Sequence, residues 1–273
     1  MKLFKKKEKK ELEPQYYLSA TNMEALNYKV YYMSKPEKLF YFMTAFVIGA
    51  AVGYLFYGGI GKDEYGNATV VTHVLNIAIP LVVGMLAGKM FLPIRTKQIL
   101  EKRRKQLNLQ FRDMLDGITT SLGAGNNVPN SFQAVYGDLK VQYEEDAFII
   151  KELEILLSGI GSNFDIETLL EDFGRRSGID DITSFANVFK ICYRKGGNIQ
   201  EIIQSTHGIL SKKMEIKEEI ATTVSGSKMD QTIMIILPII LVGMIKVMSP
   251  EFAANFVTVT GLIATTISVG LFV

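Results

Sequence analysis

Histidine and cysteine, the residues used most often in metal sites and in nucleophilic catalysis, are scarce in this sequence. Its 273 residues include two histidines, His73 and His207, and one cysteine, Cys192. The histidines are far apart in the sequence and have no third partner, which argues against a zinc site. A single cysteine excludes an intrachain disulfide and a cysteine-rich metal site. We interpret Cys192 as a buried thiol inside a helix, with a catalytic nucleophile as the alternative, and we expect no bound metal.

Glycine-rich segments that could bind a phosphate are incomplete. A phosphate-binding loop needs Gly, four residues, and then Gly-Lys-Ser/Thr. Lys62 is followed by Asp63, and Phe56 stands where the first Gly should be. Segments 123–125 and 159–161 read Gly-x-Gly, but they have no third Gly and no preceding strand, so we interpret them as helix ends. Neither a Gly-x-Ser-x-Gly elbow nor a His-Glu-x-x-His pair occurs. We therefore predict that the chain is not an enzyme and needs no cofactor.

Charged residues are the remaining candidates for function, because they cluster by sign. The stretch between Asp138 and Asp172 is strongly acidic, and basic residues gather after it. Two interpretations stay open: solvated helix faces, or a docking surface for an oppositely charged partner, since complementary charges orient association. A divalent cation held by consecutive acidic residues is a weak alternative, because adjacent helix positions diverge. The docking hypothesis names Glu144, Glu145, Asp146, Glu152, Arg175, Arg176, Arg194 and Lys195.

The apolar residues are segregated into blocks. They make up 48% of the chain, while the formal net charge of +2 gives no general attraction to nucleic acid. A bilayer core takes roughly 20 apolar residues in a helix. A cleaved signal peptide does not explain the first block, because residues 1–38 precede it. We therefore predict four transmembrane helices, near residues 39–61, 70–88, 231–248 and 252–273.

Polar and proline residues inside these blocks are Asn76 and Pro80 in the second, and Pro238 and Lys246 in the third. Such pairs can mark a substrate path in a transporter. We favour the other interpretation, a kink accompanied by a helix–helix hydrogen bond. Lys246 lies near the end of its block, so its ammonium group can reach the membrane surface.

The distribution of lysine and arginine predicts the orientation in the membrane, because these residues favour the cytoplasmic side. They are concentrated in residues 1–10 and 95–105, while the short connections near 58–67 and 249–252 carry one lysine or none. Both termini and the central domain are therefore predicted to be cytoplasmic. Within residues 1–38 we expect a basic tail attracted to anionic lipid, and a short interfacial helix near 28–37 because of its tyrosines.

The central segment, residues 94–230, is predicted to be helical throughout. Asn127 with Pro129, and Asp165, have the residue types of helix starts. Strand-like alternation bounded by tight turns does not occur there. The predicted fold class is all-α: four transmembrane helices in two hairpins, residues 39–93 and 231–273, and a cytoplasmic bundle of about six helices. The residues expected to end or bend helices, or to start the long final one, are Gly125, Gly178, Gly196, Gly197, Asn198 and Pro238.

This arrangement resembles the type II secretion F family, in particular the TadB/TadC branch of tight-adherence pilus systems. The similarity covers roughly residues 100–250. Other members of the family carry two copies of the domain, and this chain has one, which favours the tight-adherence branch. The matching segments are FRDMLDGI (111–118), LGAG (122–125), FGRRSG (173–178) and GGN (196–198), with Met234 and Pro238 in the third block.

The resemblance implies a platform protein of the bacterial inner membrane. A cytoplasmic ATPase would dock on the central domain, and its motion would pass along the helix that follows Asn198 to extract pilin or pseudopilin subunits. Other implied partners are the lipid bilayer and a sister platform protein or second copy, but not nucleic acid. The alternative is a small-solute transporter or channel with a cytoplasmic regulatory domain. That class needs polar residues in several spans or an inverted repeat, and these spans are nearly uncharged.

Overall fold

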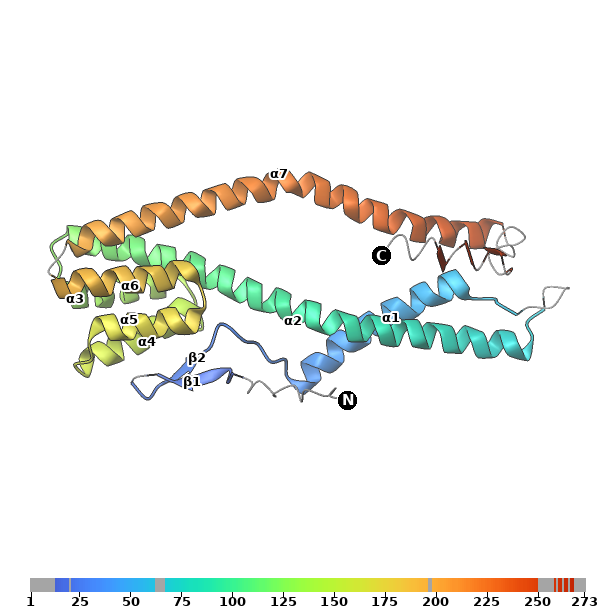
Figure 1. Cartoon of the computed structure of the whole chain (residues 1–273), viewed down its shortest axis with the longest axis horizontal. Coiled ribbons are helices and arrows are strands. Elements are labelled where there is room, and N and C mark those ends of the chain that lie inside the picture. Colours follow the sequence, from blue (N-terminus) through green and yellow to red (C-terminus); the bar gives the residue numbers. More distant parts are fainter. Residues whose placement is uncertain are drawn as a thin grey trace, which may run out of the picture. The chain divides into compact units, whose positions relative to one another are not determined.

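The computed structural model describes residues 13–19, 21–61, 67–195 and 198–249, with seven further residues between 258 and 267. The chain is mostly α-helical and divides into two compact units (Figure 1). Met1–Tyr32 and Lys97–Glu218 belong to the first unit, and Met33–Thr96 and Glu219–Val273 to the second. The elements are β1 (Tyr16–Leu18), β2 (Glu24–Leu26), α1 (Lys35–Tyr57), α2 (Val70–Gly123), α3 (Val128–Gln142), α4 (Phe148–Gly161), α5 (Ile166–Ser177), α6 (Asp180–Lys195) and α7 (Ile199–Met248).

Three helices, α1, α2 and α7, are long and apolar enough to cross a membrane. Helices α2 and α7 contain the second and third predicted apolar blocks, and α1 covers the first as far as Tyr57. Helices α2 and α7 also extend well beyond their apolar parts, and each contributes residues to both units. The fourth predicted span, residues 252–273, falls largely outside the described residues.

The second unit contains a close helix pair, α1 against α2. Glycines repeat at four-residue spacing in both helices, Gly49 and Gly53 in α1 and Gly84 and Gly88 in α2. A Cβ added to Gly84 would lie only 2.7 Å from the carbonyl oxygen of Phe46. Small residues at this spacing let two helix backbones approach closely in a membrane. The sequence carried this spacing as a signal, but our prediction did not use it.

The first unit is built from α3, α4, α5 and α6 together with parts of α2 and α7. Helices α5 and α6 pack closely, since a Cβ on Gly174 would lie 3.1 Å from the Cα of Thr183. The core is aromatic and aliphatic, which is the composition expected where apolar helix faces meet. Its largest fully buried side chains include Phe111, Phe132, Phe173, Phe185 and Phe189.

Capping residues in the sequence predicted several helix boundaries of this unit. Asn127 caps α3 as predicted, because its Oδ1 accepts from the backbone N–H of Asn130 at 2.9 Å. Gly178 terminates α5 directly after Ser177. Its φ of +59° is left-handed, a conformation that glycine adopts without steric strain. The prediction for Asp165 was half wrong: it precedes α5, but its side chain makes no capping hydrogen bond.

The N-terminal segment differs most from its prediction. The short interfacial helix expected near 28–37 is wrong, because the chain stays non-helical until α1 begins at Lys35. Strands β1 and β2 instead pair antiparallel, with Tyr17 opposite Ala25. The ring of Tyr28 lies in the core, with 2% of the residue exposed, rather than at a membrane interface. We call residues 13–32 the N-terminal strap; residue 20 lies outside the described set.

Candidate functional site

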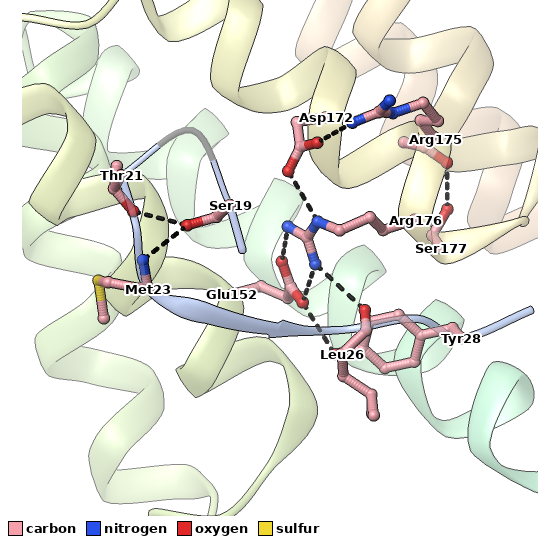
Figure 2. Close-up of polar contacts among 11 residues, drawn as sticks. Ser19, Thr21, Met23, Leu26, Tyr28, Glu152, Asp172, Arg175, Arg176 and Ser177 are labelled. Atoms are coloured by element: carbon pink, nitrogen blue, oxygen red, sulfur yellow. Dashed lines mark hydrogen bonds and ion pairs between the residues drawn. The ribbon is translucent and has the colours of Figure 1, made fainter. Parts of the chain in front are cut away.

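A buried polar cluster connects α4, α5 and the N-terminal strap (Figure 2). We call Tyr28, Glu152, Asp172 and Arg176 the Arg176 cluster. The guanidinium of Arg176 donates from Nη1 and Nη2 to the two carboxylate oxygens of Glu152, at 2.8 and 2.7 Å. Its Nε donates to Oδ2 of Asp172 at 2.7 Å. Only 2% of the Arg176 side chain and 1% of the Glu152 side chain are exposed, so water does not screen this pair.

The strap joins this cluster through one side chain and its backbone. The hydroxyl of Tyr28 donates to Glu152 at 3.0 Å, and its backbone N–H donates to the carbonyl of Arg176. Nη1 of Arg176 donates in turn to the carbonyl of Leu26 at 3.3 Å. The Tyr28 ring meets Phe148 edge-to-face, with centroids 5.6 Å apart. The cluster therefore ties three separate parts of the sequence together.

The protonation states follow from these contacts. Burial, and then the carboxylate of Glu152, raise the pKa of Tyr28 well above its ordinary value. Burial lowers the pKa of the Arg176 guanidinium, but the hydrogen bonds and charges of Glu152 and Asp172 more than offset this, and the pKa is raised. Tyr28 therefore stays a donor and Arg176 a cation at neutral pH.

This geometry corrects the docking hypothesis for two residues. Glu152 and Arg176 are interior residues that satisfy each other, so they cannot form an exposed docking surface. Burying an unpaired charge is very unfavourable, which explains why both partners and a second carboxylate lie together. The docking residues that do lie exposed are Glu144, Glu145, Asp146, Arg175, Arg194 and Lys195.

Several of these exposed charges contact oppositely charged neighbours. Arg194 on α6 donates to Glu167 on α5 at 3.0 Å, and Arg175 donates to Asp172 at 2.6 Å. Glu145 lies 3.6 Å from Lys140. The acidic partners Glu167 and Asp172 are largely buried, at 8% and 14% exposed, whereas the Lys140–Glu145 pair is exposed and contributes roughly 0–1 kcal/mol.

The acidic loop between α3 and α4 is anchored to α2 by two side chains. The hydroxyl of Tyr143, just after α3, donates to Asp113 on α2 at 2.5 Å. Oε1 of Gln110, also on α2, accepts from the backbone N–H of Ile149 at 3.2 Å and so satisfies a free amide in the first turn of α4. These contacts hold the exposed acidic residues 144–146 in a fixed position.

Alkaline titration tests this anchor. Burial, followed by the hydrogen bond and charge of Asp113, raises the pKa of Tyr143 to about 12. The folded-state pKa lies above the ordinary value of about 10, so the stabilisation is complete below pH 10 and is lost between pH 10 and about 12. Replacing Asp113 with Asn should shift one tyrosine of the tyrosinate absorbance titration toward pH 10. An unchanged titration would contradict the contact.

The residues predicted to end, bend or start helices lie at different points of the fold. Gly125 has a φ of +90° just after α2, and Pro238 lies inside α7 without ending it. Asn198 caps α7, since its Oδ1 accepts from the backbone N–H of Glu201 at 3.2 Å. Gly196 and Gly197 lie outside the described residues.

Two polar side chains of the second unit, which we call the membrane unit, contact the backbone just after α1. Oδ1 of Asn76 on α2 accepts from the backbone N–H of Gly59 at 2.8 Å. Gly59 follows the end of α1, so this is not the helix–helix hydrogen bond that was predicted. Nζ of Lys246 on α7 donates to the carbonyl of Gly58 at 3.0 Å, at the C-terminal end of α1. A cation is favourable there because the helix dipole is negative at this end.

Within the described ranges, no three His, Cys, Asp or Glu side chains come together in a group that could hold a metal ion. His207 and Ser211 lie on α7, and Asp116 on α2, but both Ser211 and Asp116 approach the same atom, Nε2 of His207. A catalytic triad needs them on different ring nitrogens.

Comparisons of the chain with protein-family models, with curated proteins and with solved structures found no match. Function must therefore be argued from the residues and from the geometry described above.

Proposed function

We propose that this chain is a platform protein of the bacterial inner membrane, belonging to a pilus-assembly or type II-like secretion system. It docks a cytoplasmic ATPase and couples the motion of that ATPase to the extraction and assembly of pilin or pseudopilin subunits. The proposal keeps the predicted topology, with four spans, a cytoplasmic helical domain and both termini in the cytoplasm. A sister platform protein or a second copy completes the assembly.

One observation carries this proposal: α7 is a single helix of 50 residues, Ile199–Met248. Its first part contributes Ile203 and Leu210 to the core of the first unit. Its second part is apolar enough to cross a membrane. Coupling of the helical domain to a membrane segment requires an element shared by both, and α7 is a helix that contributes residues to each unit.

The segments that carry the family resemblance serve this architecture. Phe111, Met114, Leu115 and Ile118 of the first segment are fully buried. In the segment FGRRSG, Phe173 is core, Arg176 holds the buried cluster and Gly178 ends α5. These segments therefore support a shared fold, while the exposed charges supply the surface on which an ATPase would dock.

Charge reversal tests the docking surface in the full-length protein. Replacing Glu144, Glu145 and Asp146 together with Lys should weaken binding of the ATPase by about 10-fold or more, because like charges would now oppose each other. Binding is measured by co-purification with, and then by titration of, a purified secretion-type ATPase from the same organism. The matched control reverses three exposed acidic residues of α7, Glu215, Glu218 and Glu219, and should bind normally.

The outcomes separate the proposals. If the unaltered protein does not bind the ATPase at all, the platform function is contradicted. If both triple variants bind equally well, the acidic loop is not the docking surface, although the function stands. Solute flux in proteoliposomes containing the purified protein would favour the transporter alternative instead.

A further inference from the structure

The N-terminal strap is held together by its own hydrogen bonds. The backbone N–H of Asn27 donates to the carbonyl of Gln15 at 2.8 Å, and its side-chain amide donates to the carbonyl of Pro14 at 3.0 Å. The backbone N–H of Tyr32 donates to Oε1 of Gln15 at 2.9 Å. These bonds join both ends of the strap to each other and not to the helices.

The bundle, in turn, does not depend on the strap for its core. The buried core cluster of the first unit draws all but one of its fully buried members from the helices or from the turn at Ile179, and the exception is Tyr28. Leu26 packs against this cluster only from its edge. Detaching the strap would uncover the Tyr28 ring and end the contacts of Thr21 with Gly159, of Lys29 with Gly178 and of the Tyr31 ring with Arg103. It would leave the packing among α2 to α7 in place.

The Arg176 cluster is arranged so that detachment leaves no charge without a partner. Arg176 keeps the carboxylates of Glu152 on α4 and Asp172 on α5, neither of which belongs to the strap. The strap contributes three uncharged groups: the hydroxyl of Tyr28, its backbone N–H and the carbonyl of Leu26. Water would replace these groups on opening, and would also reduce the desolvation cost of the ion pair. An opened state of this kind is much closer in free energy to the closed state than one that isolates a charge.

We propose that the N-terminal strap is a releasable tether, a unit that opens and closes on α4 and α5 while the bundle stays folded. The chain leaves the strap at Tyr32 and begins α1 at Lys35, so in the closed strap only the seven residues after Tyr28 connect the bundle to the start of α1. The open strap frees that connection. This switch does not depend on the platform function proposed above.

Hydrogen exchange of the full-length protein in detergent or nanodiscs tests the proposal, read by mass spectrometry on peptides of the strap and of α5. In Tyr28→Ala, the amides around residues 25–29 should exchange about 100-fold faster or more, because a buried aromatic anchor is lost. The amides of α5 should change by less than about 3-fold, which is the range of an ordinary surface substitution. The matched control is Tyr16→Ala. Tyr16 is 52% exposed in the same strap, so this substitution should leave both peptides unchanged.

The unaltered protein provides a second measurement that needs no variant. Without urea the strap amides should exchange faster than those of α5, and their rates should rise less steeply with urea, because strap opening exposes a smaller surface than unfolding of α5. If strap and α5 respond to urea identically, or if Tyr28→Ala removes protection from both together, the two form one cooperative unit and the proposal is overturned. An unchanged strap in Tyr28→Ala would overturn it as well.

Discussion

Replacing Arg176 with Met is expected to destabilise the helical bundle by about 3–5 kcal/mol, because it leaves the carboxylate of Glu152 buried without its cation. Methionine replaces the aliphatic stem of arginine, so the main change is loss of the guanidinium and its charge. Asp172 still has Arg175 as a partner, at 2.6 Å, and is not left isolated. Cys192 on α6 provides the measurement: heating the full-length protein with a maleimide dye reports when this half-buried thiol becomes reactive.

The neighbouring arginine is a matched control. Arg175→Met removes the same charge from the same helix, but its side chain is 75% exposed, so the cost should stay below about 1 kcal/mol. The double variant Glu152→Met with Arg176→Met should be more stable than Arg176→Met alone, because it removes the isolated charge. Equal unfolding temperatures for Arg175→Met and Arg176→Met would show that Arg176 is not buried as described.

The error about Glu152 and Arg176 has a physical explanation, and the sequence contained the means to avoid it. Charge counting assigned both residues to solvated or docking faces. Helical periodicity assigns them differently: Glu152 follows Ile149 by three positions, and Arg176 follows Phe173 by three. Both apolar residues are fully buried. A charged residue on an apolar helix face indicates a buried ion pair, although its partner on another helix cannot be read from the sequence.

Helix ends could be predicted from neighbouring residues, whereas contacts between residues far apart in the sequence could not. The start of α3 at Asn127 and the end of α5 at Gly178 depend on neighbouring residues, and both were predicted correctly. The strap was not predicted, because its position depends on a contact between Tyr28 and Glu152, 124 residues apart. Strands of three residues also carry little periodicity, and a tyrosine suits a membrane interface as well as a core.

The second large effect is expected from Gly84→Leu in the membrane unit. A Cβ on Gly49 would lie 2.6 Å from the Cβ of Ala87 and 3.2 Å from the Cα of Gly84, so the backbones of α1 and α2 are in close contact at this point. A leucine at position 84 would force the two helices apart, and we expect a loss of about 3 kcal/mol. Thermal loss of far-UV circular dichroism in detergent measures this, while the reactivity of Cys192 reports separately on the bundle.

Alanine substitutions at two glycines sharpen this test, because the change in stability should be favourable at one position and unfavourable at the other. Alanine is favoured over glycine inside a helix by about 1 kcal/mol. At Gly243 on α7 the added Cβ would lie 3.4 Å from the flexible tip of Leu55, which is ordinary contact, so Gly243→Ala should stabilise. At Gly84 it would lie 2.7 Å from a backbone oxygen that cannot move aside, so Gly84→Ala should destabilise despite the gain in helix propensity. The same sign for both variants would contradict the close approach of α1 and α2.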